Sequence, residues 1–166
     1  MIAAATFRVV VESPRGSSVK LKFDSALGVM TLSRPLTLGL VYPCDWGFVP
    51  GTRGADGDPL DVAVVWDTAT FPGVVLACRA IGVIRIDQRA PGHTSRQRND
   101  RIVALPVKSP RFDRWRSVRD VPARVRQELE QFFLAVTALE DKDVRILGWR
   151  GRTEALQAIK QHRLQE

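Results

Sequence analysis

The chain has 166 residues, a length that fits one folded domain with its own hydrophobic core. Its composition is 45% hydrophobic and 26% charged, which is ordinary for a soluble globular protein, and no run approaches the roughly 18 apolar residues of a membrane-spanning helix. The formal net charge of +7, carried mostly by arginine, predicts either attraction to polyanions or a general compositional bias toward arginine.

The N-terminal segment MIAAATFRVVVES does not have the pattern of a signal peptide. It has no basic start, and Arg8 interrupts the apolar run before a signal-peptide core is complete. We therefore expect a cytoplasmic protein. In that setting Cys44 and Cys78 are expected to be reduced, buried thiols rather than a disulfide.

The first two thirds of the chain predict β structure. Short β-branched runs separated by Gly, Pro, Asp and Ser are typical of strands. Such runs occupy residues 6–13, 19–23, 28–32, 61–66, 74–86 and 101–107. A succession of strands of this kind favours a small barrel or a sandwich.

A polar, basic segment, DQRAPGHTSRQRND at residues 87–100, interrupts the strands. Pro91 and Gly92 at its centre predict an exposed loop between two strands. Long connections in compact domains often carry function, so Arg89, Arg96 and Arg98 are candidates for a phosphate-facing flap. A merely solvated loop is the alternative.

The last third predicts helices. From residue 122 to 140, apolar residues recur at helical spacing, and Pro122 suits a first helical turn. Residues 143–149 read as a last strand, and residues 153–164 as a C-terminal helix with Thr153 as its N-cap. Strands followed by helices predict an α+β fold.

Three aspartates, Asp56, Asp58 and Asp61, crowd the segment GADGDPLDVAVVW at residues 54–66. Asp56 and Asp58 are two positions apart, so an extended chain points both to one side, with Cα atoms about 6.6 Å apart. Pro59 disfavours helix before it and predicts a bend that brings the third carboxylate toward the others. Converging carboxylates need a counter-charge, and their hard oxygens favour Mg²⁺ or a similar divalent ion.

The acidic segment has two other interpretations, a calcium-binding loop and a surface turn. A calcium-binding EF-hand loop is rejected, because its sixth position requires glycine and is Asp61 here, and because strands rather than helices flank the segment. An acidic surface turn, which Asp, Gly and Pro favour for local backbone reasons, stays open.

Mg²⁺ in proteins usually keeps waters and completes its shell with substrate phosphate oxygens, so the acidic segment also predicts a phosphate-bearing ligand. Lys20, on an early strand, and Arg34 are candidate donors to that phosphate. Taken singly, each is weak evidence, because most Lys and Arg residues on strands are simply solvated.

The segment DGDPLDV is preceded by YPCDWGFVPGT and followed by CRAIGVI, RIVALP and ILGW. By these segments and their order the sequence resembles the soluble family I inorganic pyrophosphatases, whose signature DGDPLDV matches. The resemblance runs from about Val9 to Trp149. It implies an OB-like five-stranded β-barrel with flanking helices, formed as a single domain over residues 1–166.

The resemblance also implies a mechanism, the hydrolysis of inorganic diphosphate to two phosphates with two or more Mg²⁺ ions. Asp56 and Asp61 would hold metal, and Asp58, itself also a possible ligand, would accept a proton from the metal-bound attacking water. Glu12 matches an outer acidic position. Lys20 and Arg34 fall where the family binds phosphate. Bacterial members are typically hexameric, which implies a homo-oligomer.

Several family positions are altered in this chain. Lys22 replaces an acidic residue, and Trp46 replaces a tyrosine, so an indole N–H would donate to substrate where a phenol did. Asn99 and Arg101 replace an acidic residue and a lysine; Asn99 can still coordinate metal through its carbonyl oxygen, and Arg101 can grip phosphate. Asp87 or Asp100 is a candidate to replace a lost carboxylate. A Tyr-Lys pair on the long helix becomes Val136 and Thr137.

Two alternative functions follow from these changes. OB-like barrels often bind single-stranded nucleic acid, so the first alternative is a catalytically weakened module that binds nucleic acid or another polyanion. Its tryptophans would then supply stacking surfaces; the other interpretation places them in the core. The four tryptophans are Trp46, Trp66, Trp115 and Trp149. Hydrolysis of another phosphoanhydride is the second alternative.

Overall fold

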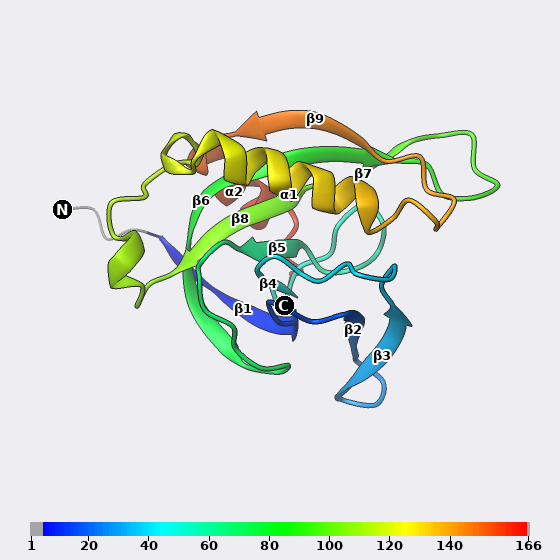
Figure 1. The fold of residues 1–166 in the computed structure, drawn as a ribbon, viewed down its shortest axis with the longest axis horizontal. Helices are drawn as coiled ribbons and strands as arrows, with labels where there is room; N and C mark the ends of the chain where they lie inside the picture. Colours follow the sequence, from blue (N-terminus) through cyan, green and yellow to red (C-terminus); the bar gives the residue numbers. More distant parts are fainter. Residues whose placement is uncertain (1–4, 166) are drawn as a thin grey trace.

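The computed structural model describes residues 5–165, and a five-stranded barrel forms its centre (Figure 1). The first four residues of the segment in which no signal peptide is expected lie outside this range. Within it, no helix combines the length and the apolar character needed to cross a membrane. The barrel strands are β1 (Thr6–Ser13), β4 (Asp45–Phe48), β5 (Asp61–Val64), β6 (Val75–Gln88) and β8 (Arg101–Pro106).

The barrel closes through a cycle of strand pairings. Strand β1 pairs antiparallel with β4, β4 pairs antiparallel with β5, and β5 pairs parallel with β8. Strand β8 then pairs antiparallel with β6, and β6 returns to β1, so no edge of the five-stranded cycle is left open. This closed barrel with two helices confirms the expected OB-like fold.

Two further strand pairings extend the barrel, and a third forms a separate hairpin. Strand β6 continues past the barrel, where β9 (Arg145–Arg150) and the short β7 (Gln97–Arg98) pair with it. Strands β2 (Val19–Asp24) and β3 (Val29–Pro35) form a separate two-stranded hairpin, which lies beside β1 in Figure 1. Leu21 N donates to Ser13 Oγ at 2.9 Å, which ties the hairpin to the end of β1.

Both expected helices are present, with shorter bounds. Helix α1 (Ala123–Ala135) begins one residue after its N-cap Pro122 and ends five residues before the expected end, in a series of turns. Helix α2 (Arg152–Gln161) starts after Gly151, so the expected cap Thr153 lies inside its first turn. Two short 3₁₀ helices, Pro110–Phe112 and Val118–Asp120, precede α1.

Alternating side chains of the barrel strands serve two core clusters. On β8, Val103 and Leu105 join the cluster that packs against α1, whereas Ile102 and Ala104 join the cluster that packs against α2. This division follows from the two-residue period of a strand. Because both faces of β8 are buried, the strand is apolar without alternation in its central residues.

Strand β4 was not predicted. Its four residues, Asp45 to Phe48, are all buried and carry neither an apolar alternation nor a β-branched run. Asp45 is buried because it is a structural acceptor: its carboxylate receives the Arg15 N–H at 2.9 Å and the Thr70 hydroxyl at 2.8 Å. Tertiary packing therefore creates a strand that the local pattern does not indicate.

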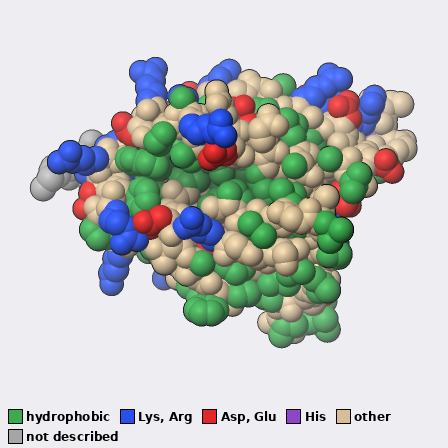
Figure 2. Space-filling model, viewed as in Figure 1, with side chains coloured by type: hydrophobic (Ala, Val, Ile, Leu, Met, Phe, Trp, Pro, Cys, Tyr) green, Lys and Arg blue, Asp and Glu red, His purple; other side chains and the backbone are tan. Residues whose placement is uncertain are grey.

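The surface separates charge from apolar area (Figure 2). Lys and Arg side chains gather along the side of α1 and β9, and hydrophobic and uncharged atoms dominate the opposite side, over the β2–β3 hairpin. The exposed apolar residues of the hairpin include Leu27, Val29 and Leu32. Cys44 and Cys78 are both free and buried, as expected from the sequence.

Gly47 on β4 leaves no room for a side chain, so a substitution there is predicted to lower the stability of the fold. A Cβ on Gly47 would stand 2.0 Å from the carbonyl oxygen of Val10 on the paired strand β1. We expect Gly47→Ala to lower the free energy of unfolding by about 1–3 kcal/mol or more, because the β1–β4 pair must separate. The measurement is urea unfolding followed by circular dichroism.

The matched control is Gly151→Ala, where a Cβ would meet only the flexible end of Glu154 at 3.3 Å. That variant is expected to lose less than about 1 kcal/mol, since Gly151 is an N-cap without a side-chain bond. Equal stability of the two variants would contradict the register of β1 and β4.

Candidate functional site

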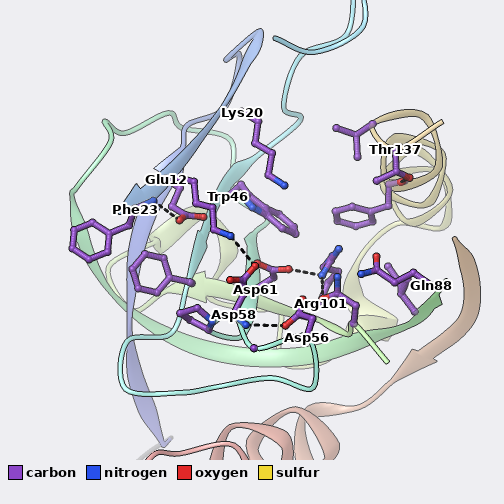
Figure 3. A pocket seen from close by; sticks show the side chains of 18 of the residues that line it. Glu12, Lys20, Phe23, Trp46, Asp56, Asp58, Asp61, Gln88, Arg101 and Thr137 are labelled. Carbon is purple, nitrogen blue, oxygen red and sulfur yellow. Dashed lines mark hydrogen bonds and ion pairs between the residues drawn. The ribbon is translucent and has the colours of Figure 1, made fainter. Parts of the chain in front are cut away.

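One cavity of about 590 Å³ opens between the hairpin, the barrel and the end of α1. It brings together the residues of the expected metal and substrate sites, most of which Figure 3 labels. They are Glu12, Lys20, Arg34, Trp46, Asp56, Asp58, Asp61, Asn99 and Arg101. Glu12 and Arg101, which are 89 positions apart in the chain, therefore line one cavity.

The acidic segment enters this cavity as a tight loop between β4 and β5. Gly54 N donates to Asp58 O at 2.7 Å, and Gly57 at the tip has φ of 87°, a conformation that favours glycine. Asp58 N donates to Asp56 Oδ1 at 3.1 Å, so the two aspartates brace each other. Asp61 begins strand β5 directly opposite Arg101 on β8.

Two of the loop carboxylates are already paired with cations of the chain. The ammonium of Lys22 lies 2.8 Å from Asp58 Oδ2, and both side chains are about half exposed. Arg101 pairs with Asp61 and also donates to Asn99 Oδ1. The Asn99 oxygen, expected to coordinate metal, is thus a hydrogen-bond acceptor for Arg101.

These pairs decide how a metal ion fits. Across residues 5–165, no three Asp, Glu, His or Cys side chains are grouped closely enough to hold one ion, so the bend does not produce the three-carboxylate cluster expected from the sequence. The physical reason is that Lys22 and Arg101 each hold one of the carboxylates. Mg²⁺ needs only one or two carboxylates with water and substrate oxygens, so the all-oxygen donor set still fits such an ion.

Glu12 adds a buried carboxylate from β1. It is 8% exposed and accepts a hydrogen bond from Phe23 N at 2.8 Å. Burial raises the pKa of Glu12 from 4.5 to about 7, although the Phe23 N–H and the nearby lysines act in the opposite direction. Near neutral pH this group therefore changes charge readily in the metal-free protein.

Lys20 and Arg34 supply positive charge from the hairpin, where they are direct partners across β2 and β3. Burial lowers the pKa of the Lys20 ammonium, and the carboxylate of Asp61 opposes that shift. Arg34 donates to Val136 O at 2.6 Å and lies 3.4 Å from Glu140. Arg34 is thereby fixed against the end of α1, at the mouth of the cavity.

Trp46 lines the inner wall of the cavity. It is 7% exposed and packs against Phe133, and the Arg101 guanidinium lies 5.2 Å from its ring centroid. Thr137, which occupies an altered family position, donates its hydroxyl to Phe133 O at 3.1 Å. The other tryptophans, Trp66, Trp115 and Trp149, are partly buried and pack against the core.

The basic loop does not supply the flap considered from the sequence. Arg96 pairs with Asp87 at 2.6 Å and with Asp143 at 2.5 Å, and Arg98 pairs with Asp100 at 2.9 Å. These bonds hold the loop to its own strands. Arg89, Arg96, Arg98, Asp87 and Asp100 all lie outside the residues that line the main cavity.

Neither Asp87 nor Asp100 lines the main cavity, although Asp100 lines a small adjoining pocket together with Asp56 and Asp61. The side chain that faces the cavity from the end of β6 is Gln88, which is 8% exposed. Adjacent residues of a strand point to opposite sides, so the inward position falls on Gln88 and not on Asp87. The side chain at this position of the cavity wall is therefore the neutral amide of Gln88 and not a carboxylate.

Other residues of the cavity wall escaped the sequence analysis as site residues. Lys142, in the turn after α1, and Arg53, before the acidic loop, add positive charge. Tyr42 is buried beside Trp46, and its burial raises the pKa of the phenol to about 12. Tyr42 stands in the family-like motif YPCDWG, but Lys142 and Arg53 lie in neither a motif nor a periodic segment. The sequence pattern therefore gave no signal for these two cations.

Comparisons with known proteins show to which family the chain is similar. A family model described as inorganic pyrophosphatase matches residues 9–165. The inorganic pyrophosphatase of Streptomyces coelicolor is 40% identical over 150 residues, which cover 90% of this chain and 88% of that protein. The one from Thermus thermophilus is 35% identical over 161 residues, 95% of this chain and 89% of that protein.

Solved structures show the same fold. The crystal structure of inorganic pyrophosphatase from Thermus thermophilus has a TM-score of 0.87 at 33% identity, covering 96% of this chain and 90% of that chain. The inorganic pyrophosphatase of Coxiella burnetii has a TM-score of 0.87 at 29% identity, covering 96% and 94%. The resemblance noted in the sequence is confirmed.

The buried Glu12 predicts a pH dependence of stability in the metal-free protein. Because its folded-state pKa is raised to about 7, the folded state binds the proton more tightly, and stability falls as pH rises from about 4.5 through 7. Glu12→Gln keeps an acceptor for Phe23 N–H without ionising. Relative to wild type, we expect this variant to gain about 1–3 kcal/mol between pH 5 and pH 8.

The measurement is urea unfolding at both pH values in buffer with a chelator. Glu128→Gln removes an exposed carboxylate of α1 outside the cavity and serves as the control, with a pH profile parallel to wild type. Parallel profiles for wild type and Glu12→Gln would show that Glu12 does not carry the effect.

Proposed function

The chain belongs to the inorganic pyrophosphatase family, and from this we propose that it is a single-domain enzyme that hydrolyses inorganic diphosphate to two phosphates. One observation carries the proposal: a single cavity presents carboxylates on the β4–β5 loop and cations on the hairpin and on β8. Carboxylates activate water and bind divalent ions, and fixed cations hold phosphate oxygens. A phosphoanhydride needs both.

We propose Mg²⁺ as the cofactor, in two or more ions. Asp56 and Asp61 would hold metal, with Glu12 as an outer carboxylate and Asn99 as a neutral ligand where its oxygen is released from Arg101. When bound, Mg²⁺ lowers the pKa of its water and neutralises phosphate charge. Asp56 supports this assignment, because its carboxylate forms no ion pair among the described residues.

The residues of the chain then divide the work. Asp58 accepts the proton of the water that attacks one phosphorus, and the bond from that phosphorus to the bridging oxygen breaks, which leaves two phosphates. Lys20, Arg34 and Arg101 bind and orient the phosphate oxygens. Trp46 closes the inner wall and offers its indole N–H to a phosphate oxygen.

The proposal extends to the setting of the enzyme. We expect a cytoplasmic homo-oligomer, hexameric by family resemblance, which size-exclusion chromatography with light scattering would measure. A second form of the proposal is a wider substrate range, which includes other phosphoanhydrides. It follows from the uncharged or basic side chains in the cavity at Gln88, Asn99 and Lys22, which leave fewer carboxylates there. Assays with diphosphate, triphosphate and nucleoside triphosphates would separate the two.

The role of Asp58 gives the central test. Asp58→Asn keeps the shape of the loop but cannot accept the proton, so we expect diphosphate hydrolysis to fall by about 10²-fold or more. Phosphate release with saturating Mg²⁺ is the measurement. Asp67→Asn is the matched control, since Asp67 is an exposed partner of Arg111 outside the cavity and its variant should keep wild-type activity. Full activity of Asp58→Asn would remove Asp58 from the mechanism.

Metal removal gives a second test. We expect a chelator to abolish hydrolysis and added Mg²⁺ to restore it, because no side chain of the cavity can replace the charge neutralisation of a divalent ion. The control is circular dichroism of the chelated protein, which should show an intact fold, since the core clusters contain no site carboxylate. Hydrolysis that persists in chelator would contradict the cofactor.

A further inference from the structure

Lys22 bridges two separate parts of the site. It lies on β2 of the hairpin, and its ammonium reaches across to Asp58 Oδ2 on the β4–β5 loop, 36 residues away in the sequence, at 2.8 Å (Figure 3). The side chain is a partner of the same aspartate that is proposed to accept the proton of water. The contact therefore concerns the chemistry of the site and not the stability of the barrel.

The charges around Lys22 are mostly negative. The hydrogen bond from Lys22 to Asp58 raises the pKa of the ammonium, and Asp58, Glu12 and Asp61 add to this effect by their negative charges, while partial burial opposes it. Lys22 is therefore a cation paired with Asp58, and Glu12 of β1 and Asp61 of β5 line the same cavity.

The two cation pairs of the cavity differ in how readily they exchange. Arg101 and Asp61 are 12% and 22% exposed, and Arg101 is held further by Asn99 and by the ring of Trp46. Lys22 and Asp58 are 46% and 51% exposed. Exposed lysine pairs are weak, because water screens them and the long side chain loses freedom on pairing. The Lys22 pair is therefore the one that a divalent ion opens more readily.

We propose that Lys22 is a tethered cation that competes with divalent metal for Asp58, so that it sets the metal affinity of the cavity. The inference rests on the proposed metal requirement, but it concerns metal binding alone and needs no turnover. A carboxylate oxygen that holds an ammonium is not free for Mg²⁺, and the fixed positive charge also opposes the approach of a second one. Removing the ammonium should thus tighten metal binding.

Titration calorimetry of Mg²⁺ into the chelator-treated, dialysed protein tests this without substrate. We expect Lys22→Gln to bind Mg²⁺ about 3–10-fold more tightly than wild type, and Lys22→Glu, which also adds a carboxylate, to bind it more tightly still. Lys108→Gln removes one lysine that does not line the cavity and should keep the wild-type affinity. Circular dichroism checks that the variants fold, which we expect because the side chain of Lys22 is about half exposed.

A double-mutant cycle distinguishes competition at Asp58 from general repulsion. In the Asp58→Asn background, Lys22→Gln should no longer change the affinity for Mg²⁺, because the carboxylate for which the two cations compete is gone. An effect of the same size in both backgrounds would overturn the proposal in favour of long-range repulsion. Unchanged affinity in both Lys22 variants, or no Mg²⁺ uptake by any variant, would also overturn it.

The outcomes separate this inference from the proposed function. If the Lys22 variants tighten Mg²⁺ binding but wild type does not hydrolyse diphosphate, the enzymatic proposal fails and the tethered cation stands. If wild type hydrolyses diphosphate with Mg²⁺ and the Lys22 variants bind the metal as wild type does, the tethered cation fails and the enzyme stands.

Discussion

The parallel pairing of β5 with β8 is the constraint on which the site depends. Its register sets Asp61 opposite Arg101 at the point where the acidic loop becomes a strand. A partly buried carboxylate is costly without a partner, and burial raises the pKa of Asp61 even beside the guanidinium. The pair therefore fixes where the loop ends, and with it the direction in which Asp56 and Asp58 face the cavity.

Much of the fold follows from the sequence, because strands and helices leave periodic patterns. The first strand is predicted to the residue, and the other long strands are found within a few positions. Strand β4 is missed because all four of its residues are buried. The barrel rather than a sandwich comes from the family resemblance, since closure depends on long-range pairing that no local pattern shows.

The membership of the site is predicted from the sequence, but its internal bonding is not. All nine expected residues line the cavity, because the motifs carry them there together. Which carboxylate meets which cation depends on register and rotamer, so the pairs of Lys22 and Arg101 are visible only in the structure. The same holds for Gln88 and Asp87, since a shift of one residue on a strand exchanges its two faces.

The β2–β3 hairpin stands outside the closed barrel, with its own strand pairing and a hydrogen bond to Ser13 as one tie to β1. Its two lysines and Arg34 supply cations to the cavity, Arg101 of β8 adds another, and Asp56, Asp58 and Asp61 come from the β4–β5 loop and β5. Part of the binding of the anion thus resides on a separately supported part of the chain. Evolution can retune the grip on the anion by changing the hairpin, without disturbing the scaffold that holds the carboxylates.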